Sequence, residues 1–138
     1  MSEHCEFCRL VRREGPASCV YEDKEVMAFL SIRPINEGHT LVIPKKHFEN
    51  IYEIPDEELA HLFKVVKKVA NAVKKGINAE GINIAQNNGR AAGQVVFHLH
   101  VHIIPRYENL EKQGLAPHRE TWEASRLDEV ATKIRQFI

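Results

Sequence analysis

Histidine and apolar residues alternate strictly between residues 97 and 103, and this run constrains the fold more than any other part of the chain. Successive side chains of a β-strand point to opposite faces, so the apolar residues share one face and the histidines share the other. The apolar residues are Phe97, Leu99, Val101 and Ile103, and the histidines are His98, His100 and His102. The apolar face must pack on a core, and the histidines must find polar partners because burying them unpaired costs free energy. The run therefore predicts a strand with one face on the core and one face carrying a polar site.

Other segments supply further strands and two helices. Strand patterns occur at Ser18 to Glu22, Val26 to Leu30, Thr40 to Ile43, Gly81 to Gln86 and Val95 to Ile104. An apolar stripe at helical spacing predicts a helix from about Asp56 to Lys75, with Gly76 as its C-cap. A second amphipathic pattern predicts a helix from Leu127 to Phe137, with Ser125 and Asp128 as a capping pair. Strands grouped around one long helix favour an α+β fold with an antiparallel sheet of about five strands.

The chain of 138 residues has the size of one domain, and no repeat or linker divides residues 1–138. Nineteen basic residues balance nineteen acidic ones, so no overall field favours nucleic acid or membrane as a partner. Neither a signal peptide nor a segment of transmembrane length is evident, and we expect a cytoplasmic protein. A local phosphate site remains compatible with zero net charge, because backbone N–H groups can bind an anion.

Three histidines on one strand face suggest chemistry, and two uses stay open. Neutral imidazole is a common metal ligand, so neighbouring histidines could share an ion. Alternatively, one histidine attacks a substrate while its neighbours fix its tautomer. The loop before the strand favours attack on phosphorus. Asn87 offers amide donors there, and Gly89, Ala92 and Gly93 let backbone N–H groups approach an anion closely.

The segment His98–Ile104 resembles the signature of the histidine triad (HIT) family, in which histidine alternates with apolar residues. The resemblance continues upstream through Gly93-Gln94, Asn87 and the run from Gly38 to His47. It covers residues from about 5 to 107 and leaves the C-terminal thirty or so residues outside. It implies a HIT-like antiparallel sheet that continues across a homodimer, followed by a variable C-terminal segment at residues 108–138.

The resemblance also implies roles for individual residues. His100 would be the nucleophile that takes a nucleotidyl group from an α-phosphate before water hydrolyses the adduct. His102 would contact the phosphate and assist the leaving group, with Asn87 nearby, and His98 would complete the catalytic set. The implied nucleotide-binding residues are Phe29, Ser31, Ile32, His39, Asn87, Gly93, Gln94, Val95, His100 and His102.

Within that set, Phe29 and Ile32 would enclose the base, with Phe7 and Leu10 as weaker candidates for the same wall. Backbone N–H groups of Gly93, Gln94 and Val95 would contact the phosphate, and His39 would support the histidines.

Two positions depart from the family pattern. Val95 stands where many members carry Ser or Thr, so no hydroxyl is available there to assist the leaving group. Ser31 stands where many carry Asp or Asn to hold the ribose hydroxyls. A serine can make one hydrogen bond to the ribose but not two, which predicts weaker nucleotide binding.

Cys5 and Cys8 have the close spacing of half a tetrahedral zinc site, although a redox pair or inert structural cysteines have the same spacing. The resemblance supplies the other half, since it matches His47 and His98 to ligand positions. A closed Cys₂His₂ set has no open coordination position, so the implied zinc is structural and clamps the N-terminal segment 1–14. Cys19 is left over and is interpreted as a strand residue.

The leading hypothesis is a nucleotidyl hydrolase or transferase acting on a purine nucleotide such as a nucleoside phosphoramidate, or an acyl- or sulfo-nucleotide. A dinucleoside polyphosphate hydrolase uses the same chemistry with another leaving group. A nucleotide-binding regulatory module with slow incidental hydrolysis is a different class. A catalytic zinc hydrolase with the histidines as ligands is disfavoured if Cys5 and Cys8 complete the metal shell.

Overall fold

The computed structural model describes residues 4–109 and 121–138, and its five-stranded sheet has the order β1-β2-β3-β5-β4. Every neighbouring pair of strands is antiparallel. The strands are β1 (Cys19–Glu22), β2 (Val26–Leu30), β3 (Thr40–Pro44), β4 (Gly81–Ala85) and β5 (Val101–Arg106). The helices are α1 (Glu6–Val11), α2 (Asp56–Gly76), α3 (Ala124–Arg135) and the short 3₁₀ helix η1 (Arg90–Ala92). The expected α+β class with an antiparallel five-stranded sheet is confirmed.

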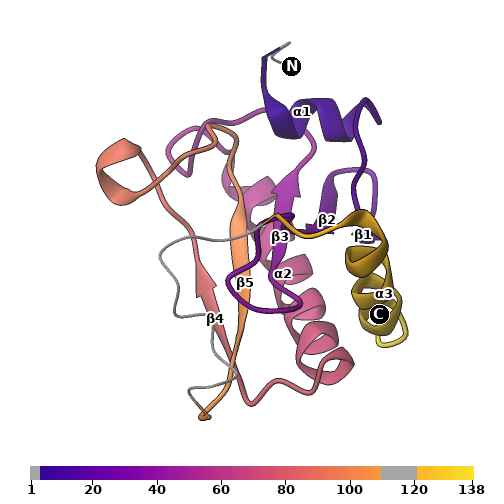
Figure 1. The fold of residues 1–138 in the computed structure, drawn as a ribbon. Helices are drawn as coiled ribbons and strands as arrows, with labels where there is room; N and C mark the ends of the chain where they lie inside the picture. The colour runs from indigo at the N-terminus through magenta and orange to yellow at the C-terminus, as the bar shows by residue number, and fades with distance from the viewer. Residues whose placement is uncertain (1–3, 110–120) are drawn as a thin grey trace.

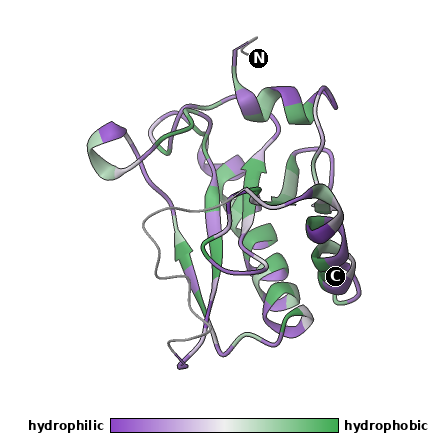
Figure 2. Ribbon diagram, in the orientation of Figure 1, coloured by the Kyte–Doolittle hydropathy of each residue, from purple (hydrophilic) through white to green (hydrophobic). Residues whose placement is uncertain are grey.

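Helices α2 and α3 cover one face of this sheet (Figure 1) and form the main core with it. Val69 and Val73 of α2 and Ile134 of α3 are fully buried against Val42 of β3 and Val101 of β5. In Figure 2, α2 shows apolar and polar residues on alternate sides of its turns, as a helix between a core and solvent requires. None of the described helices combines the length and apolar character needed to cross a bilayer.

Helix α1 lies at one end of the sheet, at the top of Figure 1. Its Phe7 packs against the opposite sheet face, in a smaller core with Met27 and Phe29 of β2 and Leu41 and Ile43 of β3. No pattern in the sequence predicts this helix, because its six residues are too few to show helical periodicity. Among the described helices, α1 thus covers the second face of the sheet at one end only.

The histidine run differs from expectation in where the strand begins. The strand expected from Val95 to Ile104 is regular only from Val101, as β5. Its pairing with β3 stops at Val42 and Val101, two residues before β3 ends, so residues before Val101 are outside the ladder. The Leu99 N–H instead donates to the Phe48 carbonyl at 2.7 Å. The expected alternation holds from Leu99 onward, since Leu99 and Val101 are buried in the core. It fails at Phe97, which was expected to pack on the core and is 37% exposed.

The ends of the long helix also need correction. Gly76 is the last residue of α2 and not its C-cap, which is Ile77. A β-carbon on Gly76 would lie 2.9 Å from the α-carbon of Ile134, so glycine is needed where α2 and α3 cross. The left-handed residue after α2 is Asn78, with φ of 58°.

Helix α3 begins at Ala124 and ends at Arg135, earlier at both ends than expected. The expected capping pair is wrong, because Glu123 is the N-cap and makes no side-chain capping hydrogen bond. Asp128 instead accepts a hydrogen bond from the Ser18 hydroxyl at 2.6 Å, which ties α3 to the start of β1. Residues 110–120 of the variable C-terminal segment and residues 1–3 of the N-terminal segment lie outside the described residues.

Candidate active site and metal centre

A cleft of about 690 Å³ opens on the sheet face opposite α2, beside α1. This volume suits a small organic ligand. Eight of the expected site residues line it: Phe29, Ser31, Ile32, Asn87, Gly93, Val95, His100 and His102. Three others, His39, Gln94 and His98, are buried behind this lining.

The tautomer of His100 follows from its main-chain contact. Its Nδ1 lies 2.7 Å from the carbonyl oxygen of His98. A carbonyl can only accept, so Nδ1 carries the proton and Nε2 of the neutral ring keeps its lone pair. Burial lowers the pKa of His100, against the raising effects of this hydrogen bond and of the nearby Glu6 charge. The ring is therefore held neutral, with an unprotonated nitrogen on a side chain that lines the cleft.

Phe7 fixes the other side of this ring. Its ring centroid lies 5.2 Å from that of His100 at 84°, and 5.4 Å from that of Phe29 at 70°. Both arrangements are edge-to-face, which is a favourable geometry for aromatic rings. Phe7 is 5% exposed, so it is mainly a packing wall behind His100 and contributes a small area to the cleft.

A chain of hydrogen bonds likewise sets the tautomer of His102. The Ile35 N–H donates to Nδ1 of His39 at 3.1 Å, so the proton of a neutral His39 ring lies on Nε2. Nε2 of His39 lies 2.9 Å from Nδ1 of His102, which must then be the acceptor. The proton of His102 is consequently on Nε2. In their neutral forms, His100 thus has a lone pair at Nε2, whereas His102 has an N–H donor at Nε2.

The loop before the histidines is organised by Gln94, in a way that the sequence did not predict. Its side chain accepts from the Gly89 N–H and donates to the carbonyl of Glu49 and, at 3.1 Å, to that of Val96. Gly89 and Gly93 have φ near +90°, which favours glycine at both positions.

This turn uses two of the three expected phosphate donors. The Gly93 N–H donates to Arg90 and the Gln94 N–H donates to Gly89. Within the part of the chain that the structure describes, the Val95 N–H has no acceptor, and Val95 is 80% exposed. Among these three, the Val95 N–H is the donor that a ligand can engage without breaking the turn.

The loop after β2 forms another side of the cleft and is tied down at several points. The Ser31 N–H donates to the His39 carbonyl at 2.8 Å, and the Ile32 carbonyl accepts from the Trp122 N–H at 2.7 Å. The Arg33 N–H donates to the Ser31 hydroxyl at 3.3 Å. Trp122 precedes α3, so the C-terminal segment contributes to holding this side of the cleft.

Several cleft residues had no signal in the sequence. Glu6 and Arg33 are charged residues that line it, and Leu41 and Ile104 form part of its floor. Leu41 and Ile104 are buried apolar strand residues, which the sequence does not distinguish from other core residues, and isolated charges match no motif. The position of Arg33 two residues after Ser31 was the one signal in the sequence that could have placed Arg33 in the cleft.

A second cluster lies next to the first. Sγ of Cys5 is 3.3 Å from Nδ1 of His98, and Sγ of Cys8 is 3.3 Å from Nδ1 of His47 and 3.5 Å from that of His98. All four ligand atoms lie within 4.8 Å of one another. Tetrahedral zinc with two thiolates and two imidazoles has sulfur-to-nitrogen separations of about 3.5 Å, so this donor set fits zinc.

Protonation of His98 also suits a metal. Its Nε2 donates to the Pro44 carbonyl at 2.7 Å, which leaves Nδ1 unprotonated and facing the cysteines. Burial lowers the pKa of His98 to about 4. Sγ of Cys5 additionally accepts the Cys8 N–H at 3.3 Å, which holds the two cysteines together at the start of α1.

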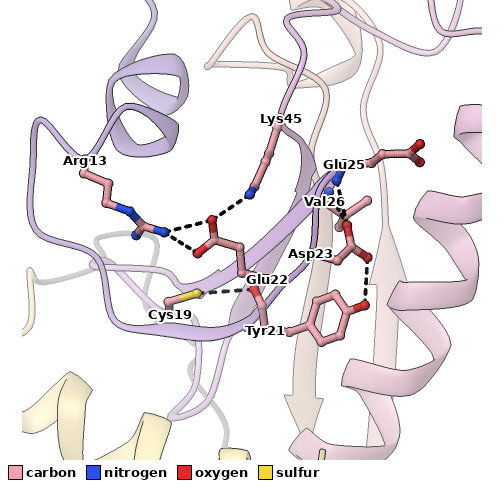
Figure 3. A network of polar contacts seen from close by, with 8 residues as sticks. All are labelled: Arg13, Cys19, Tyr21, Glu22, Asp23, Glu25, Val26 and Lys45. Atoms are coloured by element: carbon pink, nitrogen blue, oxygen red, sulfur yellow. Dashed lines mark hydrogen bonds and ion pairs between the residues drawn. The ribbon is translucent and has the colours of Figure 1, made fainter.

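An ion-pair bridge anchors the far end of α1 (Figure 3). Glu22 of β1 accepts from Arg13, which follows α1, at 2.7 and 2.9 Å, and pairs with Lys45, which follows β3, at 2.6 Å. Hydrogen bonds from Lys45 and then Arg13 lower the pKa of Glu22. The helix that carries Phe7 is therefore held at one end by the Cys/His cluster and at the other by charge.

The HIT domain family model matches residues 12–109, and this chain belongs to that family. An uncharacterized HIT-like protein of Methanocaldococcus jannaschii is 56% identical over 104 residues, or 75% of this chain and 80% of the relative. Adenosine 5′-monophosphoramidase HNT1 of Candida albicans is 36% identical over 142 residues, covering 99% of this chain and 93% of the relative. A Zn-bound histidine triad family protein from Mycobacterium smegmatis superposes with a TM-score of 0.83 at 36% identity, covering 96% of this chain and 91% of that one. A hydrolase is thus among the relatives that match nearly the full chain.

Proposed function

We propose that this protein is a nucleotidyl hydrolase or transferase that acts at the α-phosphate of purine nucleoside phosphoramidates through a covalent nucleotidyl-histidine on His100. The observation that carries the proposal is the 2.7 Å contact of His100 Nδ1 with the His98 carbonyl. It makes Nε2 a nucleophile with its lone pair in place before substrate arrives.

The reaction would proceed in two displacements. Nε2 of His100 attacks the α-phosphorus of an N-protonated phosphoramidate, the phosphorus–nitrogen bond breaks, and the neutral amine leaves with its own proton. Nε2–H of His102 donates to a phosphoryl oxygen, and the Val95 N–H and the Asn87 amide, which belong to residues that line the cleft, would do the same. Such donors stabilise charge that develops in the transition state. Water then attacks the phosphorus, the bond from phosphorus to Nε2 breaks, and one proton of the water is released to solvent. The nucleoside monophosphate leaves as His100 regains its lone pair.

The nature of the relatives supports the choice of leaving group. The Candida albicans relative is an adenosine 5′-monophosphoramidase by name and matches nearly the whole of both chains. The base would lie against Phe29 and Ile32, of which Ile32 is 46% exposed and therefore accessible to a ligand.

We also propose that Cys5, Cys8, His47 and His98 hold a structural zinc ion. The distances between their donor atoms support this, as does the zinc in the Mycobacterium smegmatis structure. A bound zinc would cross-link α1 to the sheet and fix the backbone at His98, whose carbonyl orients the nucleophile.

Chemical trapping tests the nucleophile. Protein mixed with adenosine 5′-phosphoramidate and quenched in base should contain an adenylyl group on a peptide that includes His100, located by mass spectrometry. His100→Ala should lack the adduct and the turnover, whereas His61→Gln, a change outside the cleft, should keep both. Turnover by His100→Ala, or metal-dependent turnover without an adduct, would refute the proposal. Preferential turnover of diadenosine tetraphosphate would keep the nucleophile and change the leaving group.

A homodimer completes the proposal. Strand β4 is an edge strand of the sheet, and Ile84 on it is 45% exposed. No strand lies beyond β4 in the part of the chain that the structure describes, and an edge with an exposed apolar residue is suited to pairing with a second copy. Sedimentation analysis should give twice the mass of the chain, and Ile84→Lys should shift the population toward monomer. A wild-type monomer at micromolar concentration would contradict this.

A further inference from the structure

Arg33 is the one Lys or Arg among the described residues that line the cleft. It is exposed, and within residues 4–109 and 121–138 its guanidinium takes part in no ion pair or hydrogen bond. Glu6, the carboxylate in the same lining, is not paired with it and acts instead on His100. The proposed phosphoryl transfer at His100 assigns no role to Arg33.

The backbone that carries Arg33 is fixed. Its own N–H donates to the Ser31 hydroxyl, and the residues before it are held by the His39 carbonyl and the Trp122 N–H. Further along the loop, the Asn36 side chain donates to the Pro105 carbonyl at 2.7 Å. A cation on a fixed loop loses less backbone entropy on binding an anion than one on a mobile loop.

The position of this loop indicates which part of a ligand it would meet. Phe29, Ile32 and His100 all line the cleft, and the proposed function puts the base against Phe29 and Ile32 and the α-phosphorus at His100. In a nucleoside 5′-phosphate, the ribose joins the base to the phosphate. Ser31 and Arg33 adjoin the apolar residues along the chain, so they are suited to meet the ribose and its substituents.

Ser31 and Arg33 together would interact with a ribose phosphate differently from a carboxylate at position 31. A carboxylate at position 31 would accept from ribose hydroxyls and repel a phosphate attached to them. A serine hydroxyl next to an unpaired guanidinium can instead donate to such a phosphate. The same contrast, an acidic residue against an arginine, distinguishes NAD from NADP in dinucleotide-binding folds.

We propose that Arg33 and Ser31 form a subsite for a phosphate on the ribose, so that the preferred nucleotides carry a 2′- or 3′-phosphate besides the 5′-phosphoryl group. The inference rests on the proposed function for the placement of the nucleotide. It extends that function from nucleoside phosphoramidates in general to those phosphorylated on the sugar.

Calorimetric titration of three nucleotides tests the subsite: adenosine 5′-monophosphate, adenosine 2′,5′-bisphosphate and adenosine 3′,5′-bisphosphate. At low ionic strength, one bisphosphate should bind wild-type protein at least about tenfold more tightly than the monophosphate, as a charge-assisted hydrogen bond can supply. The two bisphosphates separate the ribose positions. Added salt should reduce the advantage because Arg33 is exposed.

Two variants and a control locate the effect. Arg33→Gln should reduce the advantage to about twofold or less, and Ser31→Asp should do the same by pairing with Arg33 and repelling the phosphate. Arg9→Gln removes an exposed charge outside the cleft lining and should preserve the advantage. Equal binding of all three nucleotides, or an advantage that survives Arg33→Gln, overturns this inference while the proposed function stands. Failure of the monophosphate itself to bind would overturn both.

Discussion

Asp23 lies in the turn between β1 and β2, and its carboxylate is the acceptor of a dense network (Figure 3). Oδ1 accepts the N–H groups of Glu25 and Val26, both at 2.8 Å, and Oδ2 accepts the Tyr21 hydroxyl at 2.7 Å. Nε2 of His61 on α2 lies 2.8 Å from the same Oδ2. Replacing this carboxylate in Asp23→Asn tests how strongly the network contributes to stability.

The magnitude follows from the pKa of the carboxyl group. Burial alone raises the pKa of Asp23, but the hydrogen bonds outweigh it and lower the pKa from 3.8 to about 2. Since a tenfold change in proton affinity is about 1.4 kcal/mol, the network stabilises the folded protein by about 2 kcal/mol at neutral pH. This stabilisation is present above the unfolded-state pKa and is lost as the pH falls through the folded-state value. Between about pH 6 and about pH 3 the loss is about 1 kcal/mol.

Urea unfolding followed by circular dichroism at a series of pH values measures this directly. The difference in unfolding free energy between wild type and Asp23→Asn should be about 2 kcal/mol near pH 6 and about 1 kcal/mol near pH 3. Groups that do not contact Asp23 titrate in both proteins and cancel in the difference. Asp56→Asn, which removes an exposed carboxylate from the first turn of α2, is the control for charge alone. A difference that stays constant with pH would refute the reasoning.

Three further outcomes can be checked. Gly76→Ala should destabilise the protein by about 1–3 kcal/mol in a thermal melt, because its β-carbon would lie 2.9 Å from an α-carbon of α3 and this outweighs the better helix propensity of alanine. Gly81→Ala, whose β-carbon would meet open space, should leave the stability nearly unchanged. A strong chelator should lower the melting temperature of wild type and leave that of Cys8→Ser unchanged; equal responses would contradict the zinc assignment. His39→Phe should lower kcat by about tenfold or more with little change in nucleotide affinity, because the substitution removes the partner that fixes the tautomer of His102. An unchanged kcat would contradict this role of His39.

The sequence predicted those parts of the molecule that repeat at short range. The alternation around His100 predicts which side chains enter the core, and Leu99, Val101 and Ile103 are buried there. The apolar stripe of α2 gives its length to within one residue at the C-terminal end. The site residues followed from motif resemblance, and eight of them line one cleft although they come from segments up to seventy residues apart.

The features that the sequence did not predict depend on contacts between residues far apart along the chain. The role of Gly76 depends on α3, which follows some fifty residues later, and the course of residues 94–98 depends on Gln94 reaching Glu49. Helix α1 is held by side chains far along the chain, through the contacts of Cys5 and Cys8 with His47 and His98 and the ion pair of Arg13 with Glu22, and not by a periodic pattern of its own. Arg33 is notable only because folding places it in a cleft without a carboxylate partner.

The group that orients His100 is a peptide carbonyl, and this has a consequence for how the protein can vary. A side-chain acceptor could be lost by a single amino-acid substitution, but the carbonyl oxygen of residue 98 is present whatever amino acid stands there. Loss of alignment would need a change in the path of the main chain, such as a proline inserted nearby. A substitution at position 98 would therefore act on the nucleophile through the path of the main chain, which the proposed zinc on His98 would help to fix, and not through loss of the acceptor itself.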